Sequence, residues 1–313
     1  MLAPIVLFVY NRLDHTRLTV EALANNGLAS ETDLYVFADG PKNRSDVHSV
    51  EEVGRFIEQI DGFKRVAVKA SAENNGLANS IVAGVSSLLL EHDSVIVLED
   101  DIVTSPYFLT YMNEALELYR NQPKVVSIHA YTPPIDSDLP ETFFLRGADC
   151  WGWATWRHGW AHFRHDANLL FEELVDRNLG HAFDLDGAYP YMRMLADNAA
   201  GKNDSWAIRW HASTFLKGLL TLHPGSSLVR NIGLDGSGTH CGSDSLHQSS
   251  CVNRRVHVGG IEIEEDWKVR EEFSRHYRLS SPEISIRSRL GQMLGRLIAP
   301  LRSKRVSSSG LEG

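Results

Sequence analysis

The apolar run Val95–Leu98 and the three acids that follow it constrain this chain more than any other part of its sequence. Four consecutive aliphatic residues are typical of a strand that is buried on both faces. The next residues, Glu99, Asp100 and Asp101, repel one another unless a cation or a hydrogen-bond donor lies between them. Carboxylates are ligands of Mg2+ and Mn2+, which often also bind substrate phosphates. The segment predicts a metal and phosphate site at the end of a central strand, with a solvated acidic turn as the alternative.

Strand-like and helix-like segments alternate before these acids. Apolar runs are typical of buried strands, and apolar residues at helical spacing lie between the runs. The expected strands cover residues 5–10, 33–38, 65–69 and 94–98, and the expected helices cover residues 14–25, 46–60 and 79–90. This alternation is typical of parallel βαβ units in a doubly wound sheet. We therefore expect an α/β fold with a mixed, mainly parallel sheet flanked by helices.

The pattern changes after the acids. The expected elements are a helix over 107–119, a strand over 124–129, a loop over 133–140, an aromatic-rich segment over 149–156, and helices over 157–163 and 169–175. These mixed signals indicate an α+β half that shares the sheet of the first half. We expect a single domain over 1–255, with halves at 1–104 and 105–255, and a C-terminal helical and basic tail over 256–313.

Composition excludes some classes of protein. The chain has 313 residues and a formal net charge of −9, which argues against nucleic acid as a partner. Its three cysteines form no CxxC pair, which favours a reducing compartment over a disulfide framework. The apolar start, residues 2–10, lacks the flanks of a signal peptide and is interpreted as a buried strand. No apolar run approaches the roughly 20 residues of a membrane-spanning helix. We therefore expect a cytoplasmic protein.

The tail contains a basic amphipathic segment over residues 284–305. This segment has six Lys or Arg residues and no acid, and its apolar residues fall on one helical face. Such a helix is typical of a contact with an anionic membrane surface. A helix that packs against the acidic body of the protein is the alternative. The last eight residues are rich in Ser and Gly, which predicts disorder.

Polar groups follow the first three predicted strands as well as the fourth. Asn11 and Arg12 follow the first strand, Asp39 follows the second, and Asn75 and Asn79 follow the third. An Asp at such a place can accept a hydrogen bond from a base or ribose, and an Arg can offset phosphate charge. The asparagines taken alone are typical turn formers. Because parallel strands end at one edge of the sheet, these groups and the acid triplet predict one ligand site there.

The ordered motifs FVYNR, FADG, ENNGLANS, VLEDD, WGWATW and NDSWAIRW resemble those of nucleotide-sugar glycosyltransferases of the GT-A fold. Within that fold they are most similar to the Glu-Asp-Asp subgroup, which includes the protein-glycan N-acetylglucosaminyltransferases. The likeness covers about residues 3–245 and leaves the tail outside. The acid triplet with its strand is the most specific of the motifs. The resemblance implies a GT-A, Rossmann-like fold whose second half binds the acceptor.

The resemblance also implies roles in the nucleotide site. Asp101 matches the acid that binds Mn2+ (or Mg2+), and this ion bridges the diphosphate of the donor in that family. Asp100 matches the acid near the ribose, and Glu99 the acid near the donor sugar. Asp39 matches the acid that reads the base, and Arg12 the basic residue after the first strand.

An inverting transfer needs a general base that takes the proton of the acceptor hydroxyl. Asp204 resembles the Trp-flanked base segment of the N-acetylglucosaminyltransferases, and partial desolvation beside Trp206 would increase its basicity. A helix N-cap is the alternative role for Asp204. Asp149 is the second candidate for the base.

Aromatic and glycine-rich segments supply the remaining candidates. Trp151 and Trp153 flank a glycine and are expected to stack on the acceptor sugar, whereas Trp156 is assigned to the core. The glycine-dense segment 233–242 lacks the lysine of a Walker loop. Its His240 is a candidate second metal ligand or phosphate contact, as in some GT-A enzymes, with a structural role as the alternative.

These features together predict a metal-dependent, inverting glycosyltransferase. It would move a sugar from a nucleoside diphosphate sugar, with UDP favoured, to a saccharide acceptor in the synthesis of cell-surface glycans. A lipid-linked saccharide at the inner face of the membrane would suit the basic tail, with the protein peripheral there. A sugar-phosphate nucleotidyltransferase is one alternative. Such an enzyme normally has a glycine-rich, basic phosphate loop after the first strand, and residues 11–14 of this chain do not match one. A carbohydrate-binding protein without turnover is the other.

Overall fold

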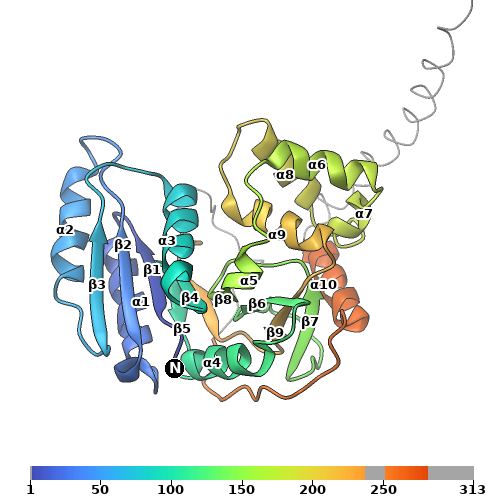
Figure 1. The fold of residues 1–313 in the computed structure, drawn as a ribbon, viewed down its shortest axis with the longest axis horizontal. Coiled ribbons are helices and arrows are strands. Elements are labelled where there is room, and N and C mark those ends of the chain that lie inside the picture. Colours follow the sequence, from blue (N-terminus) through green and yellow to red (C-terminus); the bar gives the residue numbers. More distant parts are fainter. Residues whose placement is uncertain (1, 237–250, 281–313) are drawn as a thin grey trace, which may run out of the picture.

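The framework of the fold is an eight-stranded mixed sheet with the strand order β3-β2-β1-β4-β8-β6-β9-β7 (Figure 1). The computed structural model describes residues 2–236 and 251–280. A separate two-stranded sheet pairs β10 with β5. Helices flank the large sheet, as Figure 1 shows. The expected fold class, a mixed α/β sheet flanked by helices, is confirmed.

The first half of the chain alternates strands with helices. Its elements are β1 (Ile5–Val9), α1 (Leu13–Ala24), the short 3-10 helix η1 (Ala29–Glu31), β2 (Asp33–Ala38), α2 (Val47–Ile57), β3 (Arg65–Ala70), α3 (Leu77–Glu91) and β4 (Ser94–Glu99). Strand β1 pairs in parallel with β2 and β4, and β2 pairs in parallel with β3. The predicted parallel βαβ units are therefore confirmed.

The second half adds antiparallel strands and a group of helices. Its elements are β5 (Ile102–Thr104), α4 (Phe108–Tyr119), β6 (Val125–His129), β7 (Thr142–Arg146), β8 (Trp153–Trp156), α5 (Arg157–Trp160), α6 (Ala167–Asp176), α7 (Gly180–Phe183), α8 (Tyr191–Ala199), α9 (Trp206–Leu216), β9 (Leu220–Pro224), β10 (Val229–Asn231) and α10 (Trp267–Ser280). Strand β8 links the halves, because it pairs antiparallel with β4 on one side and with β6 on the other. The predicted sharing of one sheet by both halves is therefore confirmed.

The sheet is buried on both faces. In β1, Ile5, Leu7 and Val9 belong to one apolar cluster, while Val6 and Phe8 belong to another. Successive side chains of a strand point to opposite faces, so both sets can be buried only if helices cover both faces. Residues of α1, α2 and α4 complete the first cluster, and residues of α3, α5 and α9 complete the second. Continuous apolar runs are therefore the sequence signature of the central strands here.

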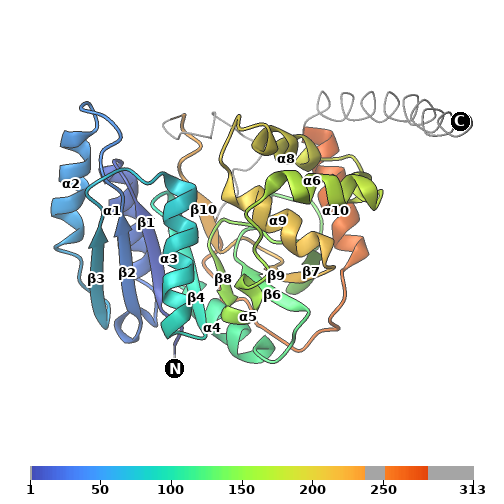
Figure 2. The ribbon, with the colours of Figure 1, turned by 45° about the horizontal axis from the view of Figure 1, so that its top comes forward.

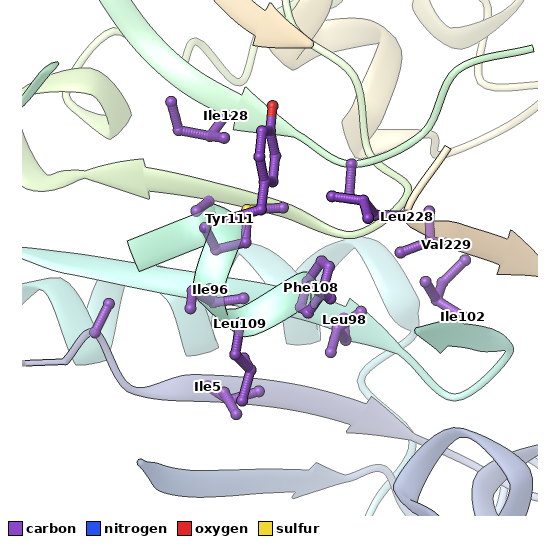
Figure 3. Packing of buried hydrophobic residues seen from close by; sticks show 14 of the residues in the cluster. Ile5, Ile96, Leu98, Ile102, Phe108, Leu109, Tyr111, Ile128, Leu228 and Val229 are labelled. Carbon is purple, nitrogen blue, oxygen red and sulfur yellow. The ribbon is translucent and has the colours of Figure 1, made fainter. Parts of the chain in front are cut away.

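Apolar packing fixes the chain on both sides of the acids (Figure 3). Leu98 of β4 and Ile102 of β5 are each 1% exposed, and Phe108 of α4 has no exposed surface. Full burial of a side chain of this kind contributes about 1.5–3 kcal/mol. Since only Asp100 and Asp101 separate β4 from β5, the backbone of these two acids is held between two buried strands.

Six strands end at the same edge of the sheet. Strands β1, β2 and β3 run parallel with β4. Strands β6 and β9 run in that direction too, because β4 and β6 are both antiparallel to β8 and β9 is parallel to β6. Strand β8 begins where these strands end. Figure 2 shows the loops of this carboxyl edge along the upper side of the molecule. The edge continues from the first half of the chain into the second.

Helix α10 packs against the second half of the sheet. Its residues Val269, Phe273 and Tyr277 are buried in one cluster with Phe143 and Leu145 of β7. The domain boundary at residue 255 stays a prediction. The basic segment 284–305 lies outside the described residues. Among the described residues, no helix is both long enough and apolar enough to cross a membrane.

Gly152 precedes β8 in a tightly packed place, and Gly201, which follows α8, is a matched glycine of positive φ without close neighbours. Gly152 has a φ of +62°, and a Cβ there would lie 2.8 Å from Cγ1 of Val229 and 3.3 Å from the ring of Phe108. Gly201 has a φ of +70° and open space around it. We predict that Gly152→Ala lowers the free energy of unfolding by about 2–4 kcal/mol, because strain and overpacking add. Gly201→Ala should cost only about 1–2 kcal/mol. Urea denaturation measures both, and equal losses would contradict the tight packing of Gly152.

Candidate active site

Arg12 lies between two of the acids. Its Nη2 atom forms an ion pair with Asp100 and another, at 2.8 Å, with Oδ2 of Asp101. The acids follow β4 and Arg12 follows β1, and these strands are neighbours in the sheet. A guanidinium that bridges two carboxylates offsets their repulsion. Arg12 is thus the counter-charge that the acid triplet requires, and the structure brings these predicted residues together.

The acids are poorly solvated. Asp100 is 4% exposed and Asp101 is 8% exposed. Burial raises the pKa of Glu99 to about 8, and the charges of Asp101 and Asp100 act in the same direction. Burial also raises the pKa of Asp100 to about 6, although the neighbouring Arg12 guanidinium opposes this shift. One guanidinium therefore compensates only part of the negative charge that this cluster would carry if fully ionised.

Two polar atoms of this cluster have no hydrogen-bond partner among the residues that the structure describes. They are Nη1 of Arg12 and Oδ2 of Asp100, and both are buried. The hydroxyl of Thr19 donates to the backbone carbonyl of Asp100 at 2.8 Å. This bond fixes the backbone of Asp100 but does not provide a partner for its carboxylate. A buried unsatisfied polar group costs about 1–3 kcal/mol. An anionic ligand that arrives with a cation would satisfy both atoms.

The turn after β10 lies directly over the acids. The N–H of Ile232 donates to the backbone carbonyl of Asp101 at 2.8 Å. The next residue, Gly233, has no room for a side chain, because a Cβ there would collide with the carboxylate of Asp101 and would lie 3.0 Å from Nη1 of Arg12. The role of Gly233 was not predicted from the sequence. The density of glycines after residue 232 was the signal that could have revealed it.

Asp39 organises the loop that follows β3. Its Oδ1 accepts the backbone N–H groups of Asn75 at 2.8 Å and Gly40 at 3.1 Å, and also the side-chain amide of Asn75 at 3.3 Å. Its Oδ2 accepts the backbone N–H of Gly76 at 2.9 Å. A carboxylate has about four acceptor positions, so one position on Oδ2 of Asp39 is left for a ligand. The predicted residues Asp39 and Asn75 are therefore in contact through hydrogen bonds.

The remaining predicted nucleotide contacts also lie at the carboxyl edge. Asn11 is partly buried in the turn between β1 and α1. Asn79 lies in the first turn of α3, and its side chain donates to the carbonyl of Asn75 at 2.9 Å. Their contact with a nucleotide stays a prediction. His240 lies outside the described residues, so its role at a metal or phosphate stays a prediction too.

Asp204 lines a polar cavity of about 410 Å³. The cavity is formed by Ala78, Asn79, His165, Asp166, Ala167, Asn168, Asn198, Ala199, Asn203, Asp204 and Arg209. Amide side chains are frequent among them, and they can donate to and accept from sugar hydroxyls. The acids of β4 do not line this cavity. Gly76 connects the two regions, because its N–H binds Asp39 while a Cβ on it would lie 3.9 Å from Oδ2 of Asp204.

Helix α9 has Ser205 as its N-cap. The Ser205 hydroxyl accepts the N–H of Ile208 at 3.4 Å. The alternative role for Asp204, that of N-cap, is therefore wrong. Arg209 instead donates to the backbone carbonyls of Asp204 at 3.1 Å and Ser205 at 3.2 Å, so the first turn of the helix holds this segment in place.

One of the predicted sugar-stacking tryptophans belongs to the core. Trp153 has no exposed surface, and its ring lies 5.3 Å from that of Trp206 and 6.2 Å from that of Trp210. The prediction that Trp153 stacks on an acceptor sugar is therefore wrong, since its side chain points into the cluster beneath α3 and α9. Trp156 is 4% exposed and lies in the core, as predicted. Trp151 keeps part of its surface exposed.

Asp149 faces two buried histidines. Its side chain is 46% exposed, its Oδ2 lies 3.9 Å from Nδ1 of His129, and its Oδ1 accepts the N–H of Cys150 at 2.8 Å. Burial opposes ionisation of Asp149, but the rings of His129 and His223 and the Cys150 N–H favour the carboxylate and keep its pKa below the usual value. A carboxylate of lowered pKa is a weak general base, which disfavours Asp149 in that role.

The acids of β4 suit a divalent cation that substrate helps to hold. Among residues 2–236 and 251–280, no three His, Cys, Asp or Glu side chains are placed to hold a metal ion. Mg2+ commonly takes one or two protein carboxylates and completes its shell with water and substrate phosphates. Asp101 and the partnerless Oδ2 of Asp100 offer such a partial donor set. The residues present therefore fit a cation that binds together with a phosphorylated ligand.

Comparisons with known proteins give only distant similarities. No protein-family model and no curated protein matches the chain. One similar solved structure is the mannosyltransferase PcManGT from Pyrobaculum calidifontis in complex with GDP-Man and Mn2+, at 10% identity and a TM-score of 0.31, covering 42% of this chain and 36% of that chain.

Two further structures are similar at the same level. S. aureus TarS matches at 12% identity and a TM-score of 0.35, over 50% of this chain and 28% of that chain. Mouse xyloside xylosyltransferase 1, in its apo form, matches at 12% identity and a TM-score of 0.33, over 52% of this chain and 72% of that chain. The chain thus spans about a third of the length of the first two structures.

The buried histidine His223 should make stability depend on pH. Burial, followed by the neighbouring His129, lowers the pKa of His223 to about 3. The unfolded chain therefore binds a proton first as the pH falls below about 6.5, and stability is lost from there down to about pH 3. We predict that His223→Gln lessens this acid loss by up to about 1.4 kcal/mol per pH unit.

Urea denaturation of both proteins at a series of pH values checks this expectation. His48→Gln is the matched control, because the His48 side chain is 79% exposed. A difference between wild type and His223→Gln that stays constant with pH would contradict a neutral His223 in the folded state.

Proposed function

We propose that this protein is a metal-dependent, inverting glycosyltransferase that uses a nucleoside diphosphate sugar, UDP-sugar foremost, and a saccharide acceptor. The observation that carries the proposal is the buried cluster of Arg12, Asp100 and Asp101 at the carboxyl edge, in which one donor and one acceptor have no hydrogen-bond partner within residues 2–236 and 251–280. A guanidinium beside carboxylates suits a phosphate that arrives with a cation. The polar cavity beside Asp204 lies at the same edge and offers room for sugar.

The donor would bind across the ends of β2, β1 and β4. Asp39 accepts a hydrogen bond from the base or ribose through its remaining position on Oδ2. Asp101 would hold Mn2+ or Mg2+, with Oδ2 of Asp100 as a second donor in addition to its expected place near the ribose, and the ion would neutralise negative charge on the leaving diphosphate. Glu99 lies toward the donor sugar. Arg12 binds a phosphate oxygen through Nη1, the atom that has no hydrogen-bond partner in the described part of the chain.

Binding of the donor requires Arg12 to exchange partners. Its bond to Asp101 occupies an oxygen of the carboxylate that the cation needs. A diphosphate oxygen can replace that carboxylate as the partner of the guanidinium, because both groups are anions whose oxygens accept from the planar fork of N–H donors of an arginine. The cation and the nucleotide should therefore bind together and should bind weakly when alone.

Asp204 acts as the general base. Its carboxylate takes the proton of the acceptor hydroxyl while the new glycosidic bond forms, and the nucleoside diphosphate leaves from the opposite face of the sugar carbon. The hydrogen bonds from Arg209 to the backbone of this segment support a fixed position for the base.

The acceptor we propose is a lipid-linked saccharide, met at the inner face of the membrane in the synthesis of cell-surface glycans. The basic amphipathic pattern of residues 284–305 supports a contact with anionic lipids. Trp151, with part of its surface exposed, would supply an apolar face to the acceptor sugar.

Nucleotide binding tests the donor site without an acceptor. We predict that one of UDP, GDP, CDP, dTDP and ADP raises the melting temperature by about 5 °C when Mn2+ is present at saturating nucleotide. Neither the nucleotide nor Mn2+ alone should produce this shift. The cation needs the Asp101 carboxylate that Arg12 occupies, and Arg12 leaves it only when a phosphate is present as a new partner. Differential scanning fluorimetry measures it.

Variants connect this shift to the acids. Asp101→Asn should abolish the joint stabilisation, whereas Asp93→Asn, at a side chain that is 85% exposed, should keep it. If no nucleotide stabilises wild type with Mn2+, the glycosyltransferase proposal is wrong and a carbohydrate-binding role is favoured. Equal stabilisation of wild type and Asp101→Asn would contradict the metal site.

The base is tested by Asp204→Asn. We predict that sugar transfer falls by about 10²–10⁴-fold, while the joint stabilisation by nucleotide and Mn2+ stays within a few fold of wild type. Asp197→Asn is the control, because Asp197 pairs with Lys202 on the surface. Transfer at a near wild-type rate by Asp204→Asn would exclude this residue as the base.

A further inference from the structure

A second polar cluster lies at the carboxyl edge, in the strands next to the acids. His129 ends β6, His223 belongs to β9, and Asp149 lies in the loop before β8. Nδ1 of His129 is 3.3 Å from Nδ1 of His223 and 3.9 Å from Oδ2 of Asp149. The proposed reaction assigns no part to these three residues. They nevertheless lie at the same edge of the sheet as the acids, because β8, β6 and β9 are the next three strands after β4.

The hydrogen bonds fix the protonation of His129. The backbone N–H of Trp151 donates to Nε2 of His129 at 3.2 Å, so Nε2 carries no proton. A neutral His129 must then carry its proton on Nδ1. This N–H points at the region shared by His223 and Asp149. Burial lowers the pKa of both histidines, which keeps both rings neutral.

Asp149 is therefore an ionised carboxylate without a fixed counter-charge. Among the described residues, no salt bridge joins Asp149 to a Lys or Arg; the Cys150 N–H donates to its Oδ1, and its Oδ2 lies 3.9 Å from Nδ1 of His129. Nearly half of its side chain is exposed. A carboxylate in this state has acceptor positions available for a ligand.

Two partly exposed aromatic side chains, Trp151 and Tyr191, belong to the segments around Asp149. The ring of Trp151 lies 4.7 Å from that of Tyr131, at an interplanar angle of 74°. Tyr131 is buried, so it supports Trp151 edge-on while Trp151 keeps exposed surface. Tyr191 is partly exposed and lies 4.6 Å from the ring of His211. Nδ1 of His211 donates to the carbonyl of Ala148 at 2.8 Å, so the rings of His211 and Tyr191 adjoin the segment that carries Asp149.

We propose that Asp149, with the partly exposed rings of Trp151 and Tyr191, forms a subsite that binds the hydroxyl groups of a neutral pyranose. Its assignment to the acceptor saccharide rests on the proposed function. The carboxylate accepts hydrogen bonds from the sugar hydroxyls, and the apolar face of the ring packs on indole. The backbone N–H of Cys150 donates to Oδ1 of Asp149 at 2.8 Å and holds the carboxylate in place.

The charges of the cluster favour a neutral sugar over an anionic one. Asp149 is negative, and His129 and His223 are neutral, so a phosphate or uronate would meet repulsion without compensation. The subsite is also close to the donor site along the sheet. Trp153, at the start of β8, pairs with Val97, which is two residues before Glu99. A sugar held by Asp149 thus lies beside the strand that carries the acids.

Ligand-observed saturation-transfer NMR with simple glycosides tests this subsite. The probes are methyl β-D-glucopyranoside, its galacto and manno counterparts, and methyl β-D-glucuronide, which differs from the first only in a carboxylate. We expect at least one neutral glycoside to bind with a Kd of a few mM, on the order expected for a few hydrogen bonds and one stacked ring. The glucuronide should bind at least about 10-fold more weakly than the glucoside.

Asp149→Asn keeps the shape of the side chain and removes its charge. This variant should bind the neutral glycoside about 10-fold more weakly than wild type and should no longer discriminate against the glucuronide. Asp93→Asn is the control and should bind as wild type does. Melting curves of the variants show that they are folded.

Three results would overturn the proposal: no glycoside binds wild type at up to about 50 mM, the glucuronide binds as well as the glucoside, or Asp149→Asn binds as wild type does. The same experiments distinguish failure of the subsite from failure of the proposed function. Nucleotide stabilisation without glycoside binding would exclude this subsite alone, whereas glycoside binding without nucleotide stabilisation would exclude the transferase and leave the subsite.

Discussion

The ion pairs between Arg12 and the acids of β4 are the interaction on which the rest of the site depends. A strand buried on both faces carries its terminal carboxylates into a poorly solvated place, where like charges cannot remain uncompensated. Arg12 can compensate them because β1 is the hydrogen-bonded neighbour of β4. One guanidinium leaves a buried donor and a buried acceptor without partners, and this remaining imbalance is what a nucleotide with its cation would remove.

The fold was predictable because its signals are local. Continuous apolar runs such as Val95–Leu98 mark strands buried on both faces, and helices between them require parallel pairing. The chain therefore shows from its sequence that the residues after β1, β2 and β4 gather at one edge. This topological argument placed Arg12, Asp39 and Asp101 together before any contact was known. Their roles toward a nucleotide stay predictions.

The failures concern properties that depend on tertiary contacts. Trp153 and Trp151 are separated by one residue and look alike in sequence, yet Trp153 lies in β8 and is buried, whereas Trp151 precedes the strand and stays partly exposed. Gly152 between them has a positive φ, so the regular alternation of a strand does not extend to Trp151. Gly233 approaches Asp101 only because β10 pairs with β5, a contact between residues far apart in the chain. The histidines that face Asp149 come from two strands that only the folded sheet makes neighbours.

The central claim is that the acids after β4 bind a cation together with a nucleotide. The most direct measurement is an anomalous difference map from crystals soaked in Mn2+ and the stabilising nucleoside diphosphate. We predict one manganese peak in direct contact with the carboxylate of Asp101 and with the diphosphate, with the Arg12 guanidinium turned from Asp101 to a phosphate oxygen. Manganese bound elsewhere in the protein, or a nucleotide bound with the Arg12–Asp101 pair intact and no metal between them, would contradict the account.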